Sequence, residues 1–283
     1  MLMTKKNILI VTGITGFIGS KITENTNFLN KYIILGVNTR GFFLFDSRLK
    51  QISKNDFLSK IINARSVDII HLATLFDLDE KNNKEVFESN VNFGKKLIDL
   101  IINTGSTINN ILYTNTVYLF SKKKSLRQSS YVLSKKLFSD YLRDLENSID
   151  TNIIEVYLSN TFGHNDIRKK LLPEMIKELI KGNDFKLKNP NEYANLLDVE
   201  TLVDELFNLI SRDSPQQVGI ISKNDYLLSS IQGFIENYIN SKEFQRINSK
   251  KTELIKDFDT DIKISLRDVL IEKKISEMID KLL

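Results

Sequence analysis

Cysteine is absent from the 283-residue chain, and only two histidines, His71 and His164, are present. The lack of cysteine excludes disulfide bonds, cysteine nucleophiles and thiolate metal ligands. Two histidines are too few for a histidine-rich metal cage, so we expect no metal site. A chain without cysteine is compatible with a reducing compartment, and we expect the protein to be cytoplasmic.

Long apolar runs and a strong charge of one sign are also missing. The sequence has no uninterrupted apolar run of about 18 residues, so we expect no membrane-spanning helix. Lys5 and Lys6 before the apolar segment 7–19 imitate a secretion signal, but threonine and glycine interrupt it and no small-residue cleavage site follows. The 40 basic and 36 acidic residues give a net charge of only +4 without a dense basic arm, which argues against nucleic acid as a partner.

Patterns typical of buried strands alternate with helical patterns through the first half of the chain. We expect strands at 7–13, 31–38, 49–53, 67–74, 109–115 and 151–160, and helices at 17–29, 56–64, 83–105 and 129–147. This alternation predicts an α/β fold with a doubly wound parallel (Rossmann) sheet covered on both faces. After residue 163 helical patterns dominate, which predicts a first domain over 1–163 and a smaller, mostly helical one over 164–283. Segments near 195–222 are expected to return to the sheet.

The first expected strand leads into VTGITGFIGS at 11–20, where Gly13, Gly16 and Gly19 recur at every third position. In open α/β sheets such a turn binds a dinucleotide, because the helix N-terminus offers N–H groups and glycine lets the backbone approach the phosphates. The spacing is G-x-x-G-x-x-G rather than G-x-G-x-x-G, so a purely structural turn is the alternative. The expected cofactor contacts in this turn are Gly13, Thr15, Gly16, Phe17, Ile18 and Gly19.

Several short segments resemble one known family. TGITGFIG, HLAT, NVNFGKKLI, YTNTVY, YVLSK and NTFG occur in an order and spacing similar to the extended short-chain dehydrogenase/reductases, the NAD-dependent epimerase/dehydratase family. The resemblance covers residues 7–222, and the compact length resembles short nucleotide-sugar C4-ketoreductases such as the CDP-paratose and abequose synthases. It implies a dinucleotide-binding domain over 1–163, a substrate-binding domain over 164–283 and a nucleotide-sugar substrate. It also implies a homodimer that pairs through the helices at 84–104 and 131–147.

The pattern Tyr-x-x-x-Lys occurs three times, as Tyr118/Lys122, Tyr131/Lys135 and Tyr238/Lys242. Tyr131 begins a helix just after the fifth expected strand, and the i,i+4 spacing places its side chain and that of Lys135 on one helix face. A nearby ammonium stabilises a phenolate and lowers the tyrosine pKa from its usual value of about 10. The resemblance implies that Thr114 hydrogen-bonds the reacting oxygen and that Lys135 also holds the nicotinamide ribose. Thr114, Tyr131 and Lys135 are therefore the predicted catalytic residues.

The resemblance assigns further contacts. It implies that Leu72, Ala73 and Thr74 line the adenine and ribose side of the cofactor and that Asn90 lies near the nicotinamide. For the three loop residues the alternative is ordinary packing at the end of a strand. For Asn90 the alternative is a helix asparagine that is exposed to solvent. The residues expected to contact the substrate are Thr114, Asn115, Tyr131 and Asn160.

The chain departs from the family pattern at two places. Asn115 and Thr116 stand where dehydratases of the family carry Asp-Glu, and neither is a useful proton donor or acceptor at neutral pH, so dehydration is not expected. Epimerisation through a Cys/His acid–base pair is not expected either, because cysteine is absent. Ala194 stands where many relatives carry an arginine that grips the diphosphate, which puts that contact in doubt.

The end of the second expected strand bears on the cofactor. Asn38, Thr39 and Arg40 follow it, in the region where NAD enzymes place a carboxylate on the ribose 2′-hydroxyl. A carboxylate would repel a 2′-phosphate, whereas a guanidinium can bind one. We therefore expect NADP(H) rather than NAD(H), with Asn38 and Arg40 as contacts, unless Arg40 is only a solvated strand-end residue.

These patterns and the resemblance together predict one function and leave two alternatives. The prediction is NAD(P)H-dependent reduction of a keto group, at C4, on a nucleotide-linked deoxysugar in surface-polysaccharide (lipopolysaccharide) biosynthesis. The alternatives are a C4 epimerase with tightly bound NAD and a non-catalytic NAD(P)-binding regulatory protein.

Overall fold

The computed structural model describes residues 7–78, 81–212 and 214–283. The chain divides into two compact units. The first runs up to Tyr157 and also contains Val203–Val218 and Asp261–Lys263, and the second contains Leu158–Leu202, Gly219–Thr260 and Ile264–Leu283. The sequence predicted a boundary at residue 163 and a return of segments near 195–222 to the sheet. This division falls after Tyr157 and places residues 203–218 in the first unit.

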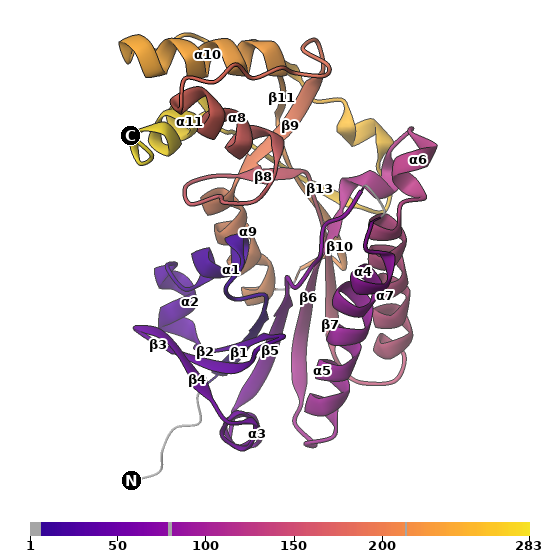
Figure 1. Ribbon diagram of the computed structural model, residues 1–283. Helices are drawn as coiled ribbons and strands as arrows, with labels where there is room; N and C mark the ends of the chain where they lie inside the picture. The colour runs from indigo at the N-terminus through magenta and orange to yellow at the C-terminus, as the bar shows by residue number, and fades with distance from the viewer. Residues whose placement is uncertain (1–6, 79–80, 213) are drawn as a thin grey trace. The chain divides into compact units, whose positions relative to one another are not determined.

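A nine-stranded sheet runs in the order β13-β10-β7-β6-β5-β1-β2-β3-β4. β1 pairs in parallel with β2 and with β5, and β5 pairs in parallel with β6 (Figure 1). The doubly wound α/β fold predicted from the sequence is therefore confirmed. The strands of this sheet are β1 (Asn7–Thr12), β2 (Ile33–Asn38), β3 (Gly41–Asp46), β4 (Arg48–Ile52), β5 (Ser66–His71), β6 (Ile108–Thr116), β7 (Asn152–Leu158), β10 (Gln217–Ser222) and β13 (Lys263–Arg267).

The edge formed by β2, β3 and β4 is antiparallel, whereas the sequence predicted one additional strand at 49–53. Only Thr39 and Arg40 separate β2 from β3, and so short a connection joins antiparallel strands, not parallel ones. Gly41 at the start of β3 has a φ of +131°, which glycine tolerates and which lets the chain reverse there. The apolar segment Gly41–Asp46 is thus a strand that the sequence analysis missed.

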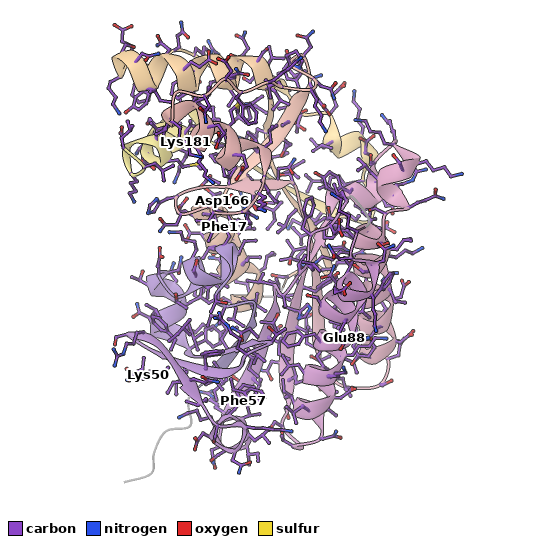
Figure 2. The ribbon with its side chains drawn as sticks, viewed as in Figure 1. Phe17, Lys50, Phe57, Glu88, Asp166 and Lys181 are labelled. Carbon is purple, nitrogen blue, oxygen red and sulfur yellow. The ribbon has the colours of Figure 1, made fainter. Side chains whose placement is uncertain are left out.

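Helices cover both faces of the first unit's sheet. On one face, α3 (Lys54–Ile62), α5 (Phe93–Ile102) and α7 (Ser130–Glu146) bury Phe57, Ile98 and Phe138 against β1, β5 and β6 (Figures 1 and 2). On the other, α2 (Thr26–Lys31) meets α9 (Val199–Ser211), where the rings of Phe28 and Phe207 pack edge to face with centroids 5.1 Å apart. Burial of both faces explains the continuous apolar run in β1.

Two predicted helices are interrupted. The helix expected at 17–29 is α1 (Phe17–Ile22) followed by α2, because the Asn25 side chain accepts hydrogen bonds from the N–H groups of Asn27 and Phe28 and starts a new helix. The helix expected at 83–105 consists of α4 (Asn83–Phe87), the π-helical turn η1 (Glu88–Asn92) and α5. Short helical segments η2 (Val117–Phe120) and α6 (Lys124–Arg127) precede α7.

The second unit mixes strands and helices around its own core. Its strands β8 (Asn160–Phe162), β9 (Tyr193–Asp198), β11 (Asn224–Leu227) and β12 (Ser249–Lys251) form a sheet in the order β12-β11-β9-β8. Its helices are α8 (Leu171–Ile180), α10 (Leu228–Ser241), α11 (Ile271–Asp280) and the short η3 (Leu254–Asp257). Met175, Phe234 and Ile275 lie in its apolar core. Within the described residues, none of the helices of either unit has the length and apolarity needed to span a membrane.

Candidate active site

The glycine-rich turn joins β1 to α1. Gly13 has a φ of +68°, and its N–H donates to the Val37 carbonyl of β2 at 3.1 Å. A Cβ on Gly13 would lie 3.1 Å from the Ala73 nitrogen, and one on Gly19 would lie 2.7 Å from the Ile14 Cα. Side chains at these positions would therefore force the turn open. The close backbone turn ahead of a helix N-terminus fits the pyrophosphate of a dinucleotide.

Asn38 connects the end of β2 to this turn. Its amide donates to the Thr15 hydroxyl at 3.4 Å, and its carbonyl accepts the Arg40 N–H at 2.8 Å. The Arg40 side chain is exposed, while its backbone carbonyl accepts a hydrogen bond from Gln51 at 3.1 Å. The short segment after β2 thus presents a guanidinium and no carboxylate beside the glycine turn.

Thr12 fixes the loop that follows β5. Its hydroxyl oxygen accepts hydrogen bonds from the N–H groups of Leu72 and Ala73, both at 3.0 Å, and lies 3.0 Å from Nδ1 of His71. Because the oxygen already accepts two hydrogen bonds, we assign its proton to the contact with Nδ1, which leaves the proton of the neutral imidazole on Nε2. Burial lowers the His71 pKa to about 3, with a further contribution from the positive charge of Lys135, so the imidazole is neutral at physiological pH.

Asn90 fixes the same loop from the other side. Its carbonyl accepts the Leu75 N–H at 2.7 Å, while its amide donates to the Leu75 carbonyl at 3.1 Å and to the Ser134 hydroxyl of α7 at 2.9 Å. Asn90 is 1% exposed, which excludes the solvated helix asparagine considered above. The π-helical turn η1 is what carries this side chain, and a π-turn of this kind is frequent at functional sites.

Helix α7 carries Tyr131 and Lys135 one turn apart. Lys135 is 2% exposed, and its Nζ donates to the Thr114 carbonyl at 2.9 Å and to the Thr74 hydroxyl at 2.5 Å. Burial lowers the Lys135 pKa to about 7. Tyr131 is also buried, and its ring packs edge to face against Phe76 with centroids 4.9 Å apart. The structure thus brings Thr114, Thr74 and Lys135 together, with Tyr131 one helical turn away.

The other two Tyr-x-x-x-Lys matches lie elsewhere. Tyr238 and Lys242 both bind Asp280 of the second unit, at 2.9 and 2.7 Å, which ties α10 to α11. Tyr118 lies in η2, before α7 begins. Of the three matches, only Tyr131 and Lys135 lie in α7, the long helix that follows β6, which is the context used to choose them.

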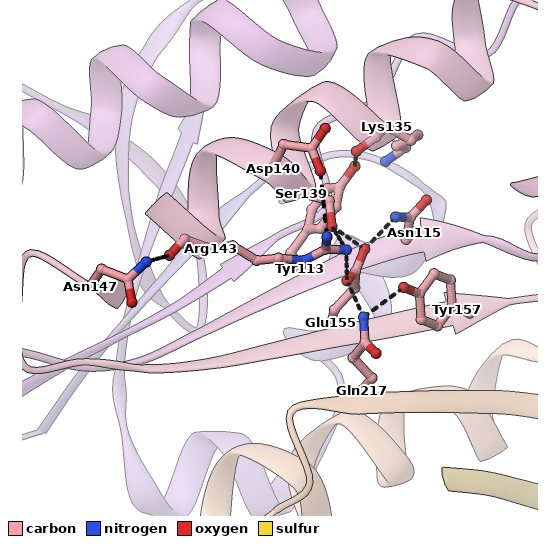
Figure 3. A network of polar contacts seen from close by, with 10 residues as sticks. All are labelled: Tyr113, Asn115, Lys135, Ser139, Asp140, Arg143, Asn147, Glu155, Tyr157 and Gln217. Atoms are coloured by element: carbon pink, nitrogen blue, oxygen red, sulfur yellow. Dashed lines mark hydrogen bonds and ion pairs between the residues drawn. The ribbon is translucent and has the colours of Figure 1, made fainter. Parts of the chain in front are cut away.

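The amide of Asn115 is hydrogen-bonded inside the protein. It donates to Glu155 of β7 at 2.5 Å, while its carbonyl accepts the Thr116 N–H at 2.7 Å (Figure 3). Asn160, the other expected substrate contact, is the first residue of β8 in the second unit. Ala194 lies in β9 opposite Tyr226, so the position of the missing arginine belongs to a strand of the second unit.

Glu155 is a buried carboxylate that the sequence analysis missed. It accepts hydrogen bonds from Asn115 and Ser139, both at 2.5 Å, and from Gln217 at 3.0 Å, and the Arg143 guanidinium lies 3.6 Å away (Figure 3). The feature of the sequence that could have identified Glu155 is its position as an acidic residue in the middle of the apolar strand NIIEVYL. Thr12 and His71 gave a comparable signal, because each is a polar residue that ends a buried apolar strand.

The model of the NAD dependent epimerase/dehydratase family matches residues 9–217, most of the chain. The chain belongs to this family. An ADP-L-glycero-D-manno-heptose-6-epimerase from Cupriavidus pinatubonensis is 23% identical over 185 residues, which cover 59% of this chain and 55% of that protein. The match thus spans about half the length of this curated relative.

Two solved epimerase structures share the fold of this chain. The UDP-glucose 4-epimerase of Thermotoga maritima, solved with UDP-glucose, superposes with a TM-score of 0.72 at 13% identity and covers 98% of this chain and 99% of that chain. The UDP-glucose 4-epimerase of Thermus thermophilus, solved with NAD, has a TM-score of 0.68 at 14% identity, with coverage of 96% and 97%. The family predicted from the sequence is confirmed, and the narrower similarity to C4-ketoreductases remains a prediction.

Proposed function

We propose that this family member reduces the C4 keto group of a nucleotide-linked deoxysugar, with NADPH as the hydride donor. The placement of Lys135 carries the proposal, because its Nζ lies 2.9 Å from the Thr114 carbonyl and one helical turn after Tyr131. This arrangement suits the orientation and protonation of a reacting oxygen. The exposed Arg40 beside the glycine turn supports NADPH rather than NADH.

Each residue has a role in this proposal. The glycine turn (Gly13, Thr15, Gly16, Phe17, Ile18, Gly19) holds the pyrophosphate, and Asn38 and Arg40 bind the 2′-phosphate. The loop Leu72, Ala73 and Thr74 lines the adenine and ribose side of the cofactor, and Asn90 lies near the nicotinamide. Bound NADPH supplies the hydride. Thr114 orients the carbonyl oxygen and Tyr131 protonates it, while the positive charge of Lys135 lowers the tyrosine pKa. Asn160 contacts the sugar nucleotide.

We also place the enzyme in the cytoplasm, in surface-polysaccharide biosynthesis, as a homodimer that pairs through α5 and α7. The observation that favours the dimer is that α7 exposes Leu133 and Leu137, one turn apart on the same helix face. Elution of the chain as a monomer at assay concentrations would contradict this pairing.

The test is a spectrophotometric screen of NADPH and NADH oxidation against nucleotide-linked 4-keto-6-deoxy sugars. We expect stoichiometric NADPH oxidation and formation of a 4-hydroxy sugar. Tyr131→Phe should lower kcat by about 10²- to 10⁴-fold and leave cofactor affinity nearly intact, because only the proton donor is lost. Tyr118→Phe, which alters another Tyr-x-x-x-Lys match, is the matched control and should keep full turnover. Normal turnover by Tyr131→Phe would refute the assignment.

A nucleotide-sugar C4 epimerase is the second candidate, because UDP-glucose 4-epimerases share the fold across nearly the whole chain. An epimerase would retain NAD through purification and interconvert two sugars without net oxidation of added cofactor. Two measurements distinguish the epimerase from the reductase. The first is the amount of NAD released when the purified protein is denatured, and the second is the set of sugars formed from UDP-glucose. Cofactor binding without turnover of either substrate class would instead favour the non-catalytic regulatory protein.

A further inference from the structure

Lys135 is a buried ammonium, and the two acceptors that its Nζ has within the part of the chain that the structure describes are uncharged. Its Nζ donates to the Thr74 hydroxyl and the Thr114 carbonyl and lies 4.9 Å from the centroid of the Tyr113 ring. Among the described residues, titratable groups near it include His71 on β5, Tyr113 on β6 and Tyr131 on its own helix. Burial keeps His71 neutral and raises the pKa of Tyr113 well above its usual value, so neither supplies a negative charge at physiological pH.

Thr74 lies in a loop that is fixed on both sides. The Leu72 and Ala73 N–H groups bind the Thr12 hydroxyl, and both backbone polar groups of Leu75 bind Asn90. The Thr74 hydroxyl is therefore held at its place by the backbone around it. Thr74 itself is exposed at the residue level, although its hydroxyl contacts the buried Nζ. It thus lies between Lys135 and the solvent-accessible side of the loop.

We propose that Thr74 is a positioning residue for Lys135, whose hydroxyl keeps the lysine cationic and directed at Thr114 before any cofactor binds. The proposal rests on the proposed catalytic role of Lys135, but its first test needs no turnover. An acceptor that binds the charged form of a group favours that form, and bonds to charged groups are the stronger ones. Burial lowers the Lys135 pKa to about 7, and in this proposal the hydrogen bond to the Thr74 hydroxyl opposes that fall.

The chain offers a matched pair of variants. Thr74→Val keeps the branched shape and removes the acceptor, whereas Thr74→Ser keeps the acceptor. The Lys135 pKa is measured in the cofactor-free protein by NMR of ¹³C-labelled lysine, with Lys135→Met used to assign the signal. We expect the pKa to fall by about one in Thr74→Val, consistent with the strength of a charged hydrogen bond, and to stay at the wild-type value in Thr74→Ser. Equal pKa values in Thr74→Val and wild type would overturn the proposal.

A second readout applies once a substrate is known. Loss of the lysine proton should inactivate the site, so the alkaline limb of kcat/KM should move to lower pH in Thr74→Val and remain in place in Thr74→Ser. Thermal unfolding of both variants shows whether the valine perturbs the fold. If no substrate is turned over, the proposed reductase function fails, while the NMR titration still decides the role of Thr74. If Thr74→Val lowers the Lys135 pKa in the NMR titration but leaves the alkaline limb of kcat/KM at the wild-type pH, the link between the Lys135 proton and catalysis is contradicted.

Discussion

The buried ammonium of Lys135 lowers the stability of the folded protein, although it lies in the candidate active site. Its pKa is about 7 in the folded protein, whereas an unfolded lysine titrates at about 10.4. Between these values the unfolded state binds more protons than the folded state, so stability rises as the pH rises through this window. Below pH 7 both states are protonated and the full cost of burying the ammonium remains. A charge with neutral partners is expensive to bury, which is typical of functional positions.

Lys135→Met should therefore be more stable than wild type at pH 7, by on the order of 2 kcal/mol, and should lack most of the rise in stability between pH 7 and 10. Urea unfolding midpoints at several pH values measure both effects. Lys136→Met, at the neighbouring exposed position, is the control and should follow the wild-type pH dependence. Parallel curves for Lys135→Met and wild type would show that burial of Lys135 costs little.

Arg40 is the residue on which the cofactor preference depends. If its guanidinium binds the 2′-phosphate, Arg40→Ala removes a charge-assisted contact and should weaken NADPH binding by about 10- to 100-fold, with NADH affinity nearly unchanged. Fluorescence titration of both cofactors measures this, and Arg48→Ala, at an exposed arginine of β4, is the control. An unchanged NADPH affinity would leave the NAD-retaining epimerase as the better function.

At the scale of elements, Glu155 connects three strands and a helix. Asn115 belongs to β6, Ser139 and Arg143 to α7, Gln217 to β10 and Glu155 to β7 (Figure 3). Two more contacts, from the Tyr113 hydroxyl to the Lys135 carbonyl at 3.0 Å and from Asn90 to Ser134, fix the same helix. Helix α7 is thus held to the sheet by polar groups near the residues that it presents to the site.

The Asn115–Glu155 pair should behave as a unit. In Asn115→Asp a second carboxylate would replace the amide donor 2.5 Å from Glu155, and we expect a loss of about 3 kcal/mol in stability at pH 7. Repulsion between the two carboxylates requires both of them to be ionised, so this loss should be smaller in acid. Adding Glu155→Gln restores one donor and one acceptor and should recover part of the loss. A double-mutant cycle by urea unfolding measures the coupling, and additive effects would contradict it.

The sequence predicted the elements that local patterns define. The apolar runs of β1 and β5, the glycine turn and the i,i+4 pair of Tyr131 and Lys135 are all visible over a few residues. β3, and with it the antiparallel pairing of the β2–β3–β4 edge, was missed because a two-residue turn left too little polar sequence to separate β3 from β2. Glu155, Thr12 and His71 were missed because their partners are distant in the chain. Thr12 and His71 are 59 residues apart, and only the pairing of β1 with β5 makes them neighbours.

At the scale of the whole molecule, the first unit is assembled from three separate stretches of chain. The Phe207 ring of α9 packs against Phe28, and the backbone N–H of Glu155 donates to the Gln216 carbonyl at 2.7 Å. Residues 203–218 therefore cover one face of the first unit's sheet and extend it beyond β7. A dinucleotide-binding domain cut at the end of β7 lacks these contacts.

We expect a fragment that ends at residue 157 not to unfold cooperatively, because Phe28 would be exposed and Glu155 would lose Gln217. Urea titration followed by far-UV circular dichroism, with the full chain as the control, tests this expectation. A sharp unfolding transition in the fragment would show that the first 157 residues fold independently of residues 203–218.

The order of the sheet also matters while the chain is being synthesised. β10 is the outer neighbour of β7, and the ribosome makes it only after all of residues 159–216. Until then the newly made β7 presents an open, largely apolar edge, which is a template for aggregation with other nascent chains. A charged residue within such a strand opposes this pairing. Glu155 is a residue of this kind, so we expect the side chain that joins four elements in the finished protein also to oppose edge pairing of the nascent one.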